Sequence, residues 1–158
     1  MPRPRVSRER LLNLLEQSWK ALRDSYEGMP DRALLEPGVV GHWSVRDVLS
    51  HITTWEEEFL KVFPLILEGK PLPRYGSINS FNAREQERKQ NLSLEQVTQQ
   101  LAATHEHLTS VLASLPETSD AVERRLRRRL RLDSYRRYGE HAAQIAAWRK
   151  SRCGGVPP

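Results

Sequence analysis

The stretch Trp43-Ser44-Val45-Arg46-Asp47-Val48-Leu49-Ser50-His51-Ile52 carries the signals that decide the fold of this chain. Ser44 and Asp47 have the spacing of a capping box, in which each side chain accepts a hydrogen bond from the other's backbone N–H. Apolar residues then recur every three or four positions, which predicts one buried helix face made of Val45, Val48, Ile52, Trp55, Phe59 and Phe63. A long helix is therefore expected to begin after Ser44, and Pro64 is expected to kink or end it.

Three further long helices follow from the same kind of pattern. Leucines and aromatic residues at helical spacing predict a helix over residues 7–26. A second capping box, Ser93 with Gln96, predicts another helix, and Asp133 is expected to cap the last one. The helix after Ser93 has apolar residues alternately three and four apart, which is typical of helices packed nearly parallel. The chain is therefore predicted to be all-α, a four-helix bundle with long crossover connections.

The length and composition indicate one domain, over residues 7–152, between a flexible basic tail at 1–6 and a C-terminal tail at 153–158. A chain of 158 residues can bury a core without covalent staples, and the single cysteine, Cys153, excludes a disulfide framework. No apolar run approaches the roughly eighteen residues that a membrane span requires. We find no secretory signal either, so we expect a cytoplasmic protein with no membrane partner. Weaker patterns at 81–91 and 117–132 allow two shorter helices.

The charge of the chain is unevenly distributed. The formal net charge is +5, and residues 120–150 hold ten basic against four acidic side chains, so the rest of the chain is close to neutral. Such a stretch could bind nucleic acid, bind a small anion, or bind nothing. The arginine-rich part of this stretch, residues 117–132, contains neither interleaved aromatic residues nor a recognisable docking motif. We therefore interpret the stretch as a solvated basic face and do not expect nucleic acid as a partner.

Two histidines are the first candidates for chemistry. His51 on the second predicted helix and His141 on the last both lie at the margin of an apolar stripe, so they could converge inside the bundle. Such a pair could hold a metal ion, or each imidazole could be a buried, hydrogen-bonded core residue. His105 and His107 are expected to be solvated. The acidic run at 56–58 is expected to be a solvated helix face, with a second-sphere carboxylate or general base as the alternative.

Two segments resemble the DinB/YfiT-like superfamily. One is Gly41–Ile52, continued by Trp55-Glu56, and the other is Asp133–Arg149; Phe81-Asn82-Ala83 also resembles a short motif that follows the second helix in that superfamily. The resemblance extends from the first helix to Trp148 and is strongest to the small ClbS/DfsB-like members. It implies a four-helix bundle, a homodimer, and a divalent metal, zinc or nickel, on three histidines. It also implies an enzyme of hydrolase or thiol-transferase type.

Carried over residue by residue, the resemblance is incomplete at the metal. His51 and His141 match two of the three ligands, but Arg137 stands where the resembled family has its third histidine. A guanidinium cannot act as a ligand, and its positive charge opposes a divalent cation. Any metal at His51 and His141 is therefore expected to be weakly held or absent. Arg137 either turns to solvent or, with the two histidines, receives a carboxylate or phosphate.

These observations leave three functions open. In the first, a metal-dependent hydrolase or thiol transferase acts on a small-molecule substrate, with His51 and His141 as metal ligands or acid/base groups. Trp55 and Tyr138 would line its pocket, and Glu140 is a further catalytic candidate. In the second, the protein is non-catalytic and binds a small anionic ligand at His51, Arg137 and His141. In the third, the arginine-rich stretch at 124–131 is a surface for nucleic acid.

Overall fold

The computed structural model describes residues 7–154, and within them the chain is helical throughout. Its elements are α1 (Arg8–Tyr26), α2 (Asp31–Leu34), α3 (Val45–Leu67), α4 (Ile78–Lys89), α5 (Leu94–Ser114), α6 (Asp120–Asp133) and α7 (Tyr135–Gly154). The described residues form no β-strand, only an isolated bridge between Val40 and Trp43. None of these helices is long and apolar enough to cross a membrane. The all-α prediction is confirmed, whereas the predicted tail at 1–6 and residues 155–158 lie outside the described part.

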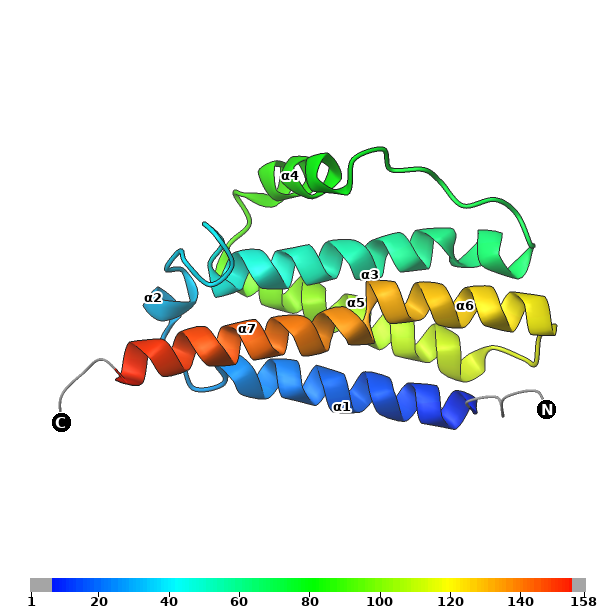
Figure 1. Ribbon diagram of the computed structural model, residues 1–158, viewed down its shortest axis with the longest axis horizontal. Helices are drawn as coiled ribbons and strands as arrows, with labels where there is room; N and C mark the ends of the chain where they lie inside the picture. The colour runs from blue at the N-terminus through cyan, green and yellow to red at the C-terminus, as the bar shows by residue number, and fades with distance from the viewer. Residues whose placement is uncertain (1–6, 155–158) are drawn as a thin grey trace.

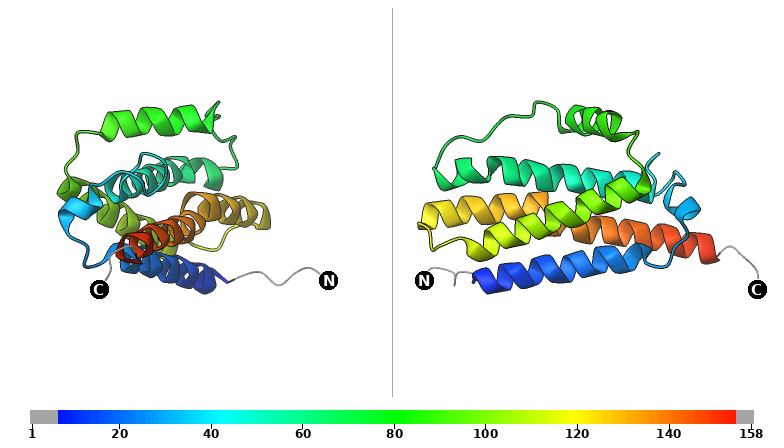
Figure 2. Two further views of the ribbon diagram at one scale, coloured as in Figure 1. Left: turned by 60° about the vertical axis from the view of Figure 1, so that its left-hand side comes forward. Right: turned by 180° about the vertical axis from the view of Figure 1, so that it is seen from behind.

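The bundle has four rods, and the fourth is shared by two helices. Figure 1 shows α6 and α7 following one another almost end to end, alongside α1 and α3. The rod of α5 lies behind them in Figure 1 and in front when the molecule is seen from behind in Figure 2. Within this rod, α6 packs mainly on α3, whereas α7 packs mainly on α1. The expected four-helix bundle is thus present, with one of its members broken in two.

The helix α3 lies at the centre of the core. Its predicted capping box is present, because Ser44 Oγ accepts from the Asp47 N–H at 3.2 Å and Asp47 Oδ2 accepts from the Ser44 N–H at 3.0 Å. Val45, Val48, Ile52 and Phe59 of the predicted face are fully buried. Phe63, which was predicted on the same face, is only partly buried, and Val62 is buried in its place. Pro64 does not end the helix, which continues to Leu67. Burial on most of its sides makes α3 the element against which α4, α5 and α6 pack, whereas α1 packs mainly on α7.

The junction between α6 and α7 differs from the sequence-based expectation. Asp133 is not an N-cap; it is the last residue of α6, is buried, and forms an ion pair with Arg129. Ser134 makes the break instead, with φ −134° and ψ −95°. Its backbone N–H donates to the Leu130 carbonyl at 3.0 Å, and its carbonyl accepts from the Tyr138 N–H at 3.0 Å. The segment predicted as weakly helical is a regular helix, because Ser119 caps its first turn.

The crossover between α3 and α5 places a short helix on the outside of α3. Figure 1 shows α4 lying above α3, at the end of the long connection that leaves the far end of α3. Two buried cations secure it: Lys89 Nζ donates to Thr54 Oγ1 at 2.8 Å, and Arg46 Nε donates to the Leu92 carbonyl at 3.0 Å. The short helix predicted at 81–91 is therefore confirmed with a shift to 78–89. Its position covers the α3 face that carries Trp55.

Candidate functional site

The structure brings His51 and His141 together between α3 and α7. Their ring centroids are 5.3 Å apart with the rings perpendicular, and both residues are buried. Each lies on the edge of its helix's apolar stripe, and the packing of α7 beside α3 turns the two edges toward one another. The indole of Trp43, just before the α3 cap, covers His51 at 4.8 Å between centroids. The site is thus a shielded pair of imidazoles near the N-terminal half of α3.

Arg137 points into this site rather than to solvent. Its Nη1 lies 3.3 Å from His51 Nε2, its guanidinium carbon lies 4.3 Å above the Trp55 ring, and its Nε donates to the Leu132 carbonyl at 2.8 Å. An arginine can only donate, so His51 Nε2 is the acceptor and carries no proton. Trp55 binds the guanidinium through its π face. Of the two arrangements considered for Arg137, the structure has the one that faces the histidines.

Both imidazoles are neutral at physiological pH. Burial, reinforced by His141 and by the charge of Arg137, lowers the pKa of His51 to about 3. Burial also lowers the pKa of His141, and a hydrogen bond to Gln144 partly opposes this effect. His141 Nδ1 lies 2.7 Å from Gln144 Oε1, an amide oxygen that can only accept, so the proton is on Nδ1 and Nε2 keeps its lone pair. The permanent charge of the site is therefore that of Arg137.

Aromatic residues from the crossover close the outer side of Trp55. Its ring contacts Tyr75 and Phe81, at 5.5 and 5.1 Å between centroids, and its Nε1 donates to Asn82 Oδ1 at 3.1 Å. Tyr75 is itself held from both sides, because its hydroxyl donates to Glu58 at 2.8 Å and accepts from Arg129 at 2.8 Å. Neither Tyr75 nor Arg129 was predicted from the sequence to belong to the site. The loop that carries Tyr75 has no periodicity from which its position could be inferred.

Asp133 and Arg129 form a buried pair beside the arginine. Burial raises the pKa of Asp133 to about 6, even though the neighbouring charges of Arg129 and Arg137 lower it. The carboxylate is already bound to Arg129. Among the described residues, no carboxylate lies within ion-pair distance of Arg137. Its guanidinium is thus the charge in this site that has no direct counterion.

Two of the predicted site residues do not join the histidines. Tyr138 is fully buried and faces α5 and α1, where its hydroxyl lies 3.2 Å from His105 Nδ1. Glu140 is exposed and forms an ion pair with Arg136 at 2.9 Å. Successive residues on a helix point about 100° apart, so the neighbours of Arg137 and His141 need not share their face. The predicted roles of Tyr138 as a pocket wall and Glu140 as a catalytic group therefore lack geometric support.

Tyr138 instead belongs to a second buried cluster, which was not predicted from the sequence. His105, expected to be solvated, is buried; it stacks on Trp19 at 3.8 Å, and its Nε2 lies 3.2 Å from Glu16 Oε1. Glu56, expected on a solvated face, is fully buried with both carboxyl oxygens lacking a hydrogen bond within the described residues. Only the packing of α5 and α7 around α3 turns this carboxyl inward.

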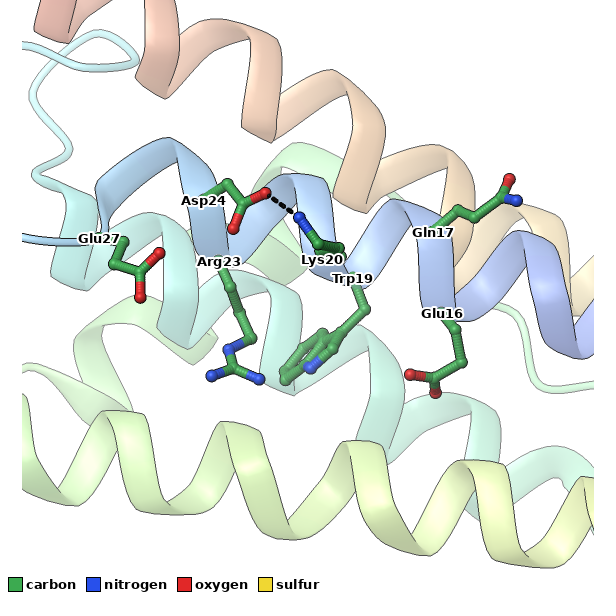
Figure 3. A pocket seen from close by; sticks show the side chains of 7 residues that line it. All are labelled: Glu16, Gln17, Trp19, Lys20, Arg23, Asp24 and Glu27. Atoms are coloured by element: carbon green, nitrogen blue, oxygen red, sulfur yellow. Dashed lines mark hydrogen bonds and ion pairs between the residues drawn. The ribbon is translucent and has the colours of Figure 1, made fainter.

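The second cluster lies beneath a groove between α1 and α5. A hollow of about 500 Å³ opens there, lined by Trp19, Arg23, Tyr26, Leu101 and His105 among others. Figure 3 shows a neighbouring pocket along α1: the side chains of Glu16, Trp19 and Arg23 extend toward α5, and the Lys20–Asp24 ion pair lines the same pocket beside them. Trp19 and His105 line the groove, and on its inner side His105 Nδ1 lies 3.9 Å from Glu56 Oε2. The buried carboxyl is therefore shielded from solvent by two stacked rings.

The donor set at His51 and His141 is poorly suited to a divalent metal. It offers two imidazole nitrogens, of which His51 Nε2 already accepts from Arg137, and the third position holds a cation. Nowhere in the described residues do three histidine, cysteine or carboxylate side chains cluster as metal ligands would. The chemistry that this arrangement supports is recognition of an anion by a guanidinium, with two neutral imidazoles beside it.

Comparison with known proteins places the chain in a family. The model of the DinB superfamily matches residues 14–148, and the chain therefore belongs to that superfamily. Among curated proteins none matches it. The resemblance seen in the sequence motifs is confirmed by this family match.

Solved structures of the same fold include ClbS and DfsB. The colibactin self-resistance protein ClbS, solved in complex with dsDNA, has 13% identity and a TM-score of 0.74, with 94% of this chain and 98% of ClbS covered. The sibling lethal factor precursor DfsB has 14% identity and a TM-score of 0.76, with 94% and 98% covered. An uncharacterised protein from Escherichia coli UTI89 has 14% identity and a TM-score of 0.75, with 93% and 95% covered. At these identities the likeness concerns the fold.

Proposed function

We propose that this protein binds a small anionic molecule, a carboxylate or a phosphate, at Arg137 with His51 and His141 beside it. The observation that carries the proposal is the guanidinium of Arg137, which is held between the Trp55 ring and His51 without a carboxylate partner. Keeping an arginine partly buried and unpaired costs free energy, and an incoming anion would recover that cost. Of the functions considered from the sequence, this is the non-catalytic binding role.

The remaining hydrogen-bonding capacity of the site suits one oxyanion. Arg137 uses Nε for the Leu132 carbonyl and Nη1 for His51, which leaves Nη2 without a partner among the described residues. His141 keeps Nε2 as a lone pair while Nδ1 is engaged by Gln144. An oxyanion bound to Nη2 would favour protonation of His141, whose Nε2–H would then donate to the same ligand. Binding is therefore expected to tighten as the pH falls from 8 to 5.

The metal-dependent hydrolase or thiol transferase is the competing function. It would require a weakly held zinc or nickel ion on His51 and His141, with Arg137 displaced from its present position. The hydrogen bond between Arg137 and His51 weighs against that displacement, since it engages the imidazole nitrogen that faces the site. The homodimer implied by the family remains a further proposal, which sedimentation velocity would test directly.

Isothermal titration calorimetry with sulfate and phenyl phosphate tests the anion site. Sulfate does not change its protonation between pH 5 and 8, so any pH dependence of its binding reports the protein. We expect Arg137→Gln to lose roughly tenfold or more in affinity, because a charged hydrogen bond is removed. The matched control is Arg136→Gln, which removes the same charge from an exposed, paired neighbour and should leave binding unchanged. Equal effects of the two variants, or wild-type affinity in Arg137→Gln, would overturn the proposal.

A metal titration separates the competing function. Arg137→His supplies a third imidazole, so this variant should bind zinc at least tenfold more tightly than the wild type. If the wild type binds one zinc ion per chain as tightly as the variant, and His51→Ala abolishes that binding, the metal-dependent function is favoured over the anion site.

A further inference from the structure

The outer surface of α6 is the strongest charge feature that the anion site does not use. The buried face of α6 consists of Glu123, Leu126, Leu130 and Asp133. Arg128 and Arg131 lie on the opposite side, exposed and one helical turn apart. Beyond the break at Ser134, the exposed Arg136 of α7 follows them. Figure 1 shows α6 and α7 running nearly end to end, and Arg128, Arg131 and Arg136 line one hollow at their junction.

A hollow of about 380 Å³ lies among these arginines, at the α6–α7 junction. Its lining residues are Arg127, Arg128, Arg131, Leu132, Tyr135 and Arg136. Leu132 is 40% exposed, although large apolar side chains on this protein are mostly buried. Tyr135 is half-buried, so its ring packs against the core and still reaches the hollow. Residues 117–132 contain no aromatic side chain, and the fold supplies one, Tyr135, from the start of α7.

The positive charge of the hollow is only partly balanced. Arg127 pairs with Glu123 at 3.4 Å, and Arg136 pairs with Glu140 at 2.9 Å. For Arg128 and Arg131, the part of the chain that the structure describes provides no carboxylate within ion-pair distance. Two guanidinium charges therefore stand side by side without counterions. This arrangement destabilises the isolated helix slightly and attracts a ligand with closely spaced negative charges.

We propose that this hollow binds single-stranded nucleic acid, with backbone phosphates on Arg128 and Arg131 and a base stacked on Tyr135. Consecutive phosphates of one strand supply negative charges at a spacing that two arginines one turn apart can contact together. A single strand leaves its bases free to stack on an aromatic ring, whereas a duplex hides them. Arg128, Arg131 and Tyr135 do not belong to the anion site, so the two proposals can be tested independently.

Other polyanions fit the hollow less well. A membrane surface would require an exposed apolar helix face for insertion, but the apolar side chains of α6 other than Leu132 point mainly into the bundle. A free phosphate would engage the guanidinium groups and leave the apolar side of the hollow, Leu132 and Tyr135, without a contact. A nucleotide within a strand uses both kinds of surface.

Fluorescence anisotropy with a labelled fifteen-residue oligothymidylate, titrated over a range of NaCl concentrations, tests this proposal. Arg128→Gln with Arg131→Gln should weaken binding and reduce the slope of log K against log salt by about 1.4, the value for two single-strand phosphates. The matched control, Arg32→Gln with Arg84→Gln, removes two exposed arginines from α2 and α4 and should leave the slope unchanged. Tyr135→Leu should lose roughly tenfold in affinity at constant slope, because it removes stacking but no charge.

Three results would overturn the proposal. The first is an equal loss in the double variant and in its matched control, which would indicate a non-specific charge effect. The second is a blunt duplex that binds as tightly as the single strand and is insensitive to Tyr135→Leu. The third is loss of binding to anionic lipid vesicles, but not to the oligonucleotide, in the Arg128/Arg131 variant. Arg137→Gln should retain oligonucleotide binding, which distinguishes failure here from failure of the anion site.

Discussion

Glu56→Gln should stabilise this protein, and the gain should grow as the pH rises. The Glu56 carboxyl is fully buried between α3, α5 and α7, and neither oxygen makes a hydrogen bond in the described structure. Burial raises its pKa well above the ordinary value, Glu57 adds to this effect, and the nearby Tyr138 and Thr104 hydroxyls partly offset it. The folded protein therefore keeps a proton on Glu56 up to a higher pH than the unfolded chain does.

The magnitude follows from proton linkage. While the folded carboxyl stays protonated, each pH unit above the unfolded-state pKa lowers the free energy of unfolding by about 1.4 kcal/mol. Stability from this group is thus complete at low pH and is lost as the pH rises toward the folded-state pKa. If the folded carboxyl stays protonated over the whole range from pH 5 to pH 7, the loss reaches its limit of about 3 kcal/mol. Glutamine has nearly the same shape and no proton to release, so the variant lacks this loss.

Urea unfolding of both proteins at half-unit steps from pH 5 to pH 7 measures the effect. Subtracting the two curves removes the contributions of the histidines and Asp133, which the proteins share. The free-energy difference should increase with pH across this range in favour of Glu56→Gln, up to a limit of about 3 kcal/mol. The control, Glu106→Gln, changes an exposed carboxyl near the same groove and should give a parallel curve. A constant difference between wild type and Glu56→Gln would refute the reasoning, since it would mean that Glu56 ionises normally.

Two further changes test the site and the helix start. His51→Gln should reduce the loss of unfolding free energy that the wild type shows on acidification. Burial lowers the pKa of His51 to about 3, so only the unfolded chain takes up a proton at this residue between pH 6.5 and pH 5. By pH 5 this uptake lowers the unfolding free energy of the wild type by about 2 kcal/mol. Urea unfolding at pH 7 and pH 5 measures this loss, with the exposed His107→Gln as the control. An equal loss of unfolding free energy in the wild type and in His51→Gln would contradict the prediction. Ser44→Ala should lower the unfolding free energy by about 1 kcal/mol, because the Asp47 N–H loses its cap. Thermal melting checks this prediction, with Ser110→Ala as the control. Equal melting temperatures for Ser44→Ala and the wild type would argue against a stabilising cap.

Local patterns were sufficient to predict most of the fold. The capping boxes at Ser44 and Ser93 mark helix starts because their hydrogen bonds close within four residues and need no distant partner. The junction of α6 and α7 was predicted wrongly, because Asp133 has the chemistry of a cap and only its ion pair with Arg129 turns it into the end of α6. A cap predicted from residue type alone cannot anticipate a competing buried partner.

The candidate site likewise has a part that the sequence predicts and a part that it does not. The sequence by itself determined that His51 and His141 lie at the edges of two helix stripes, and that an arginine stands at position 137. It could not determine where the Arg137 side chain points, because that depends on Trp55 and His51 from another helix. Nor could it place Glu56 and His105 in the interior, since their helices carry polar residues on several faces.

The start of each helix and the face that it buries are set by interactions between residues a few positions apart. They can therefore be predicted from the sequence alone. Which polar side chain is buried, and beside which partner, is set by the packing of α5, α6 and α7 around α3. That packing is a sum of contacts between segments far apart in the chain, so only the tertiary structure decided that Arg137 faces the histidines and that Glu56 lies in the core.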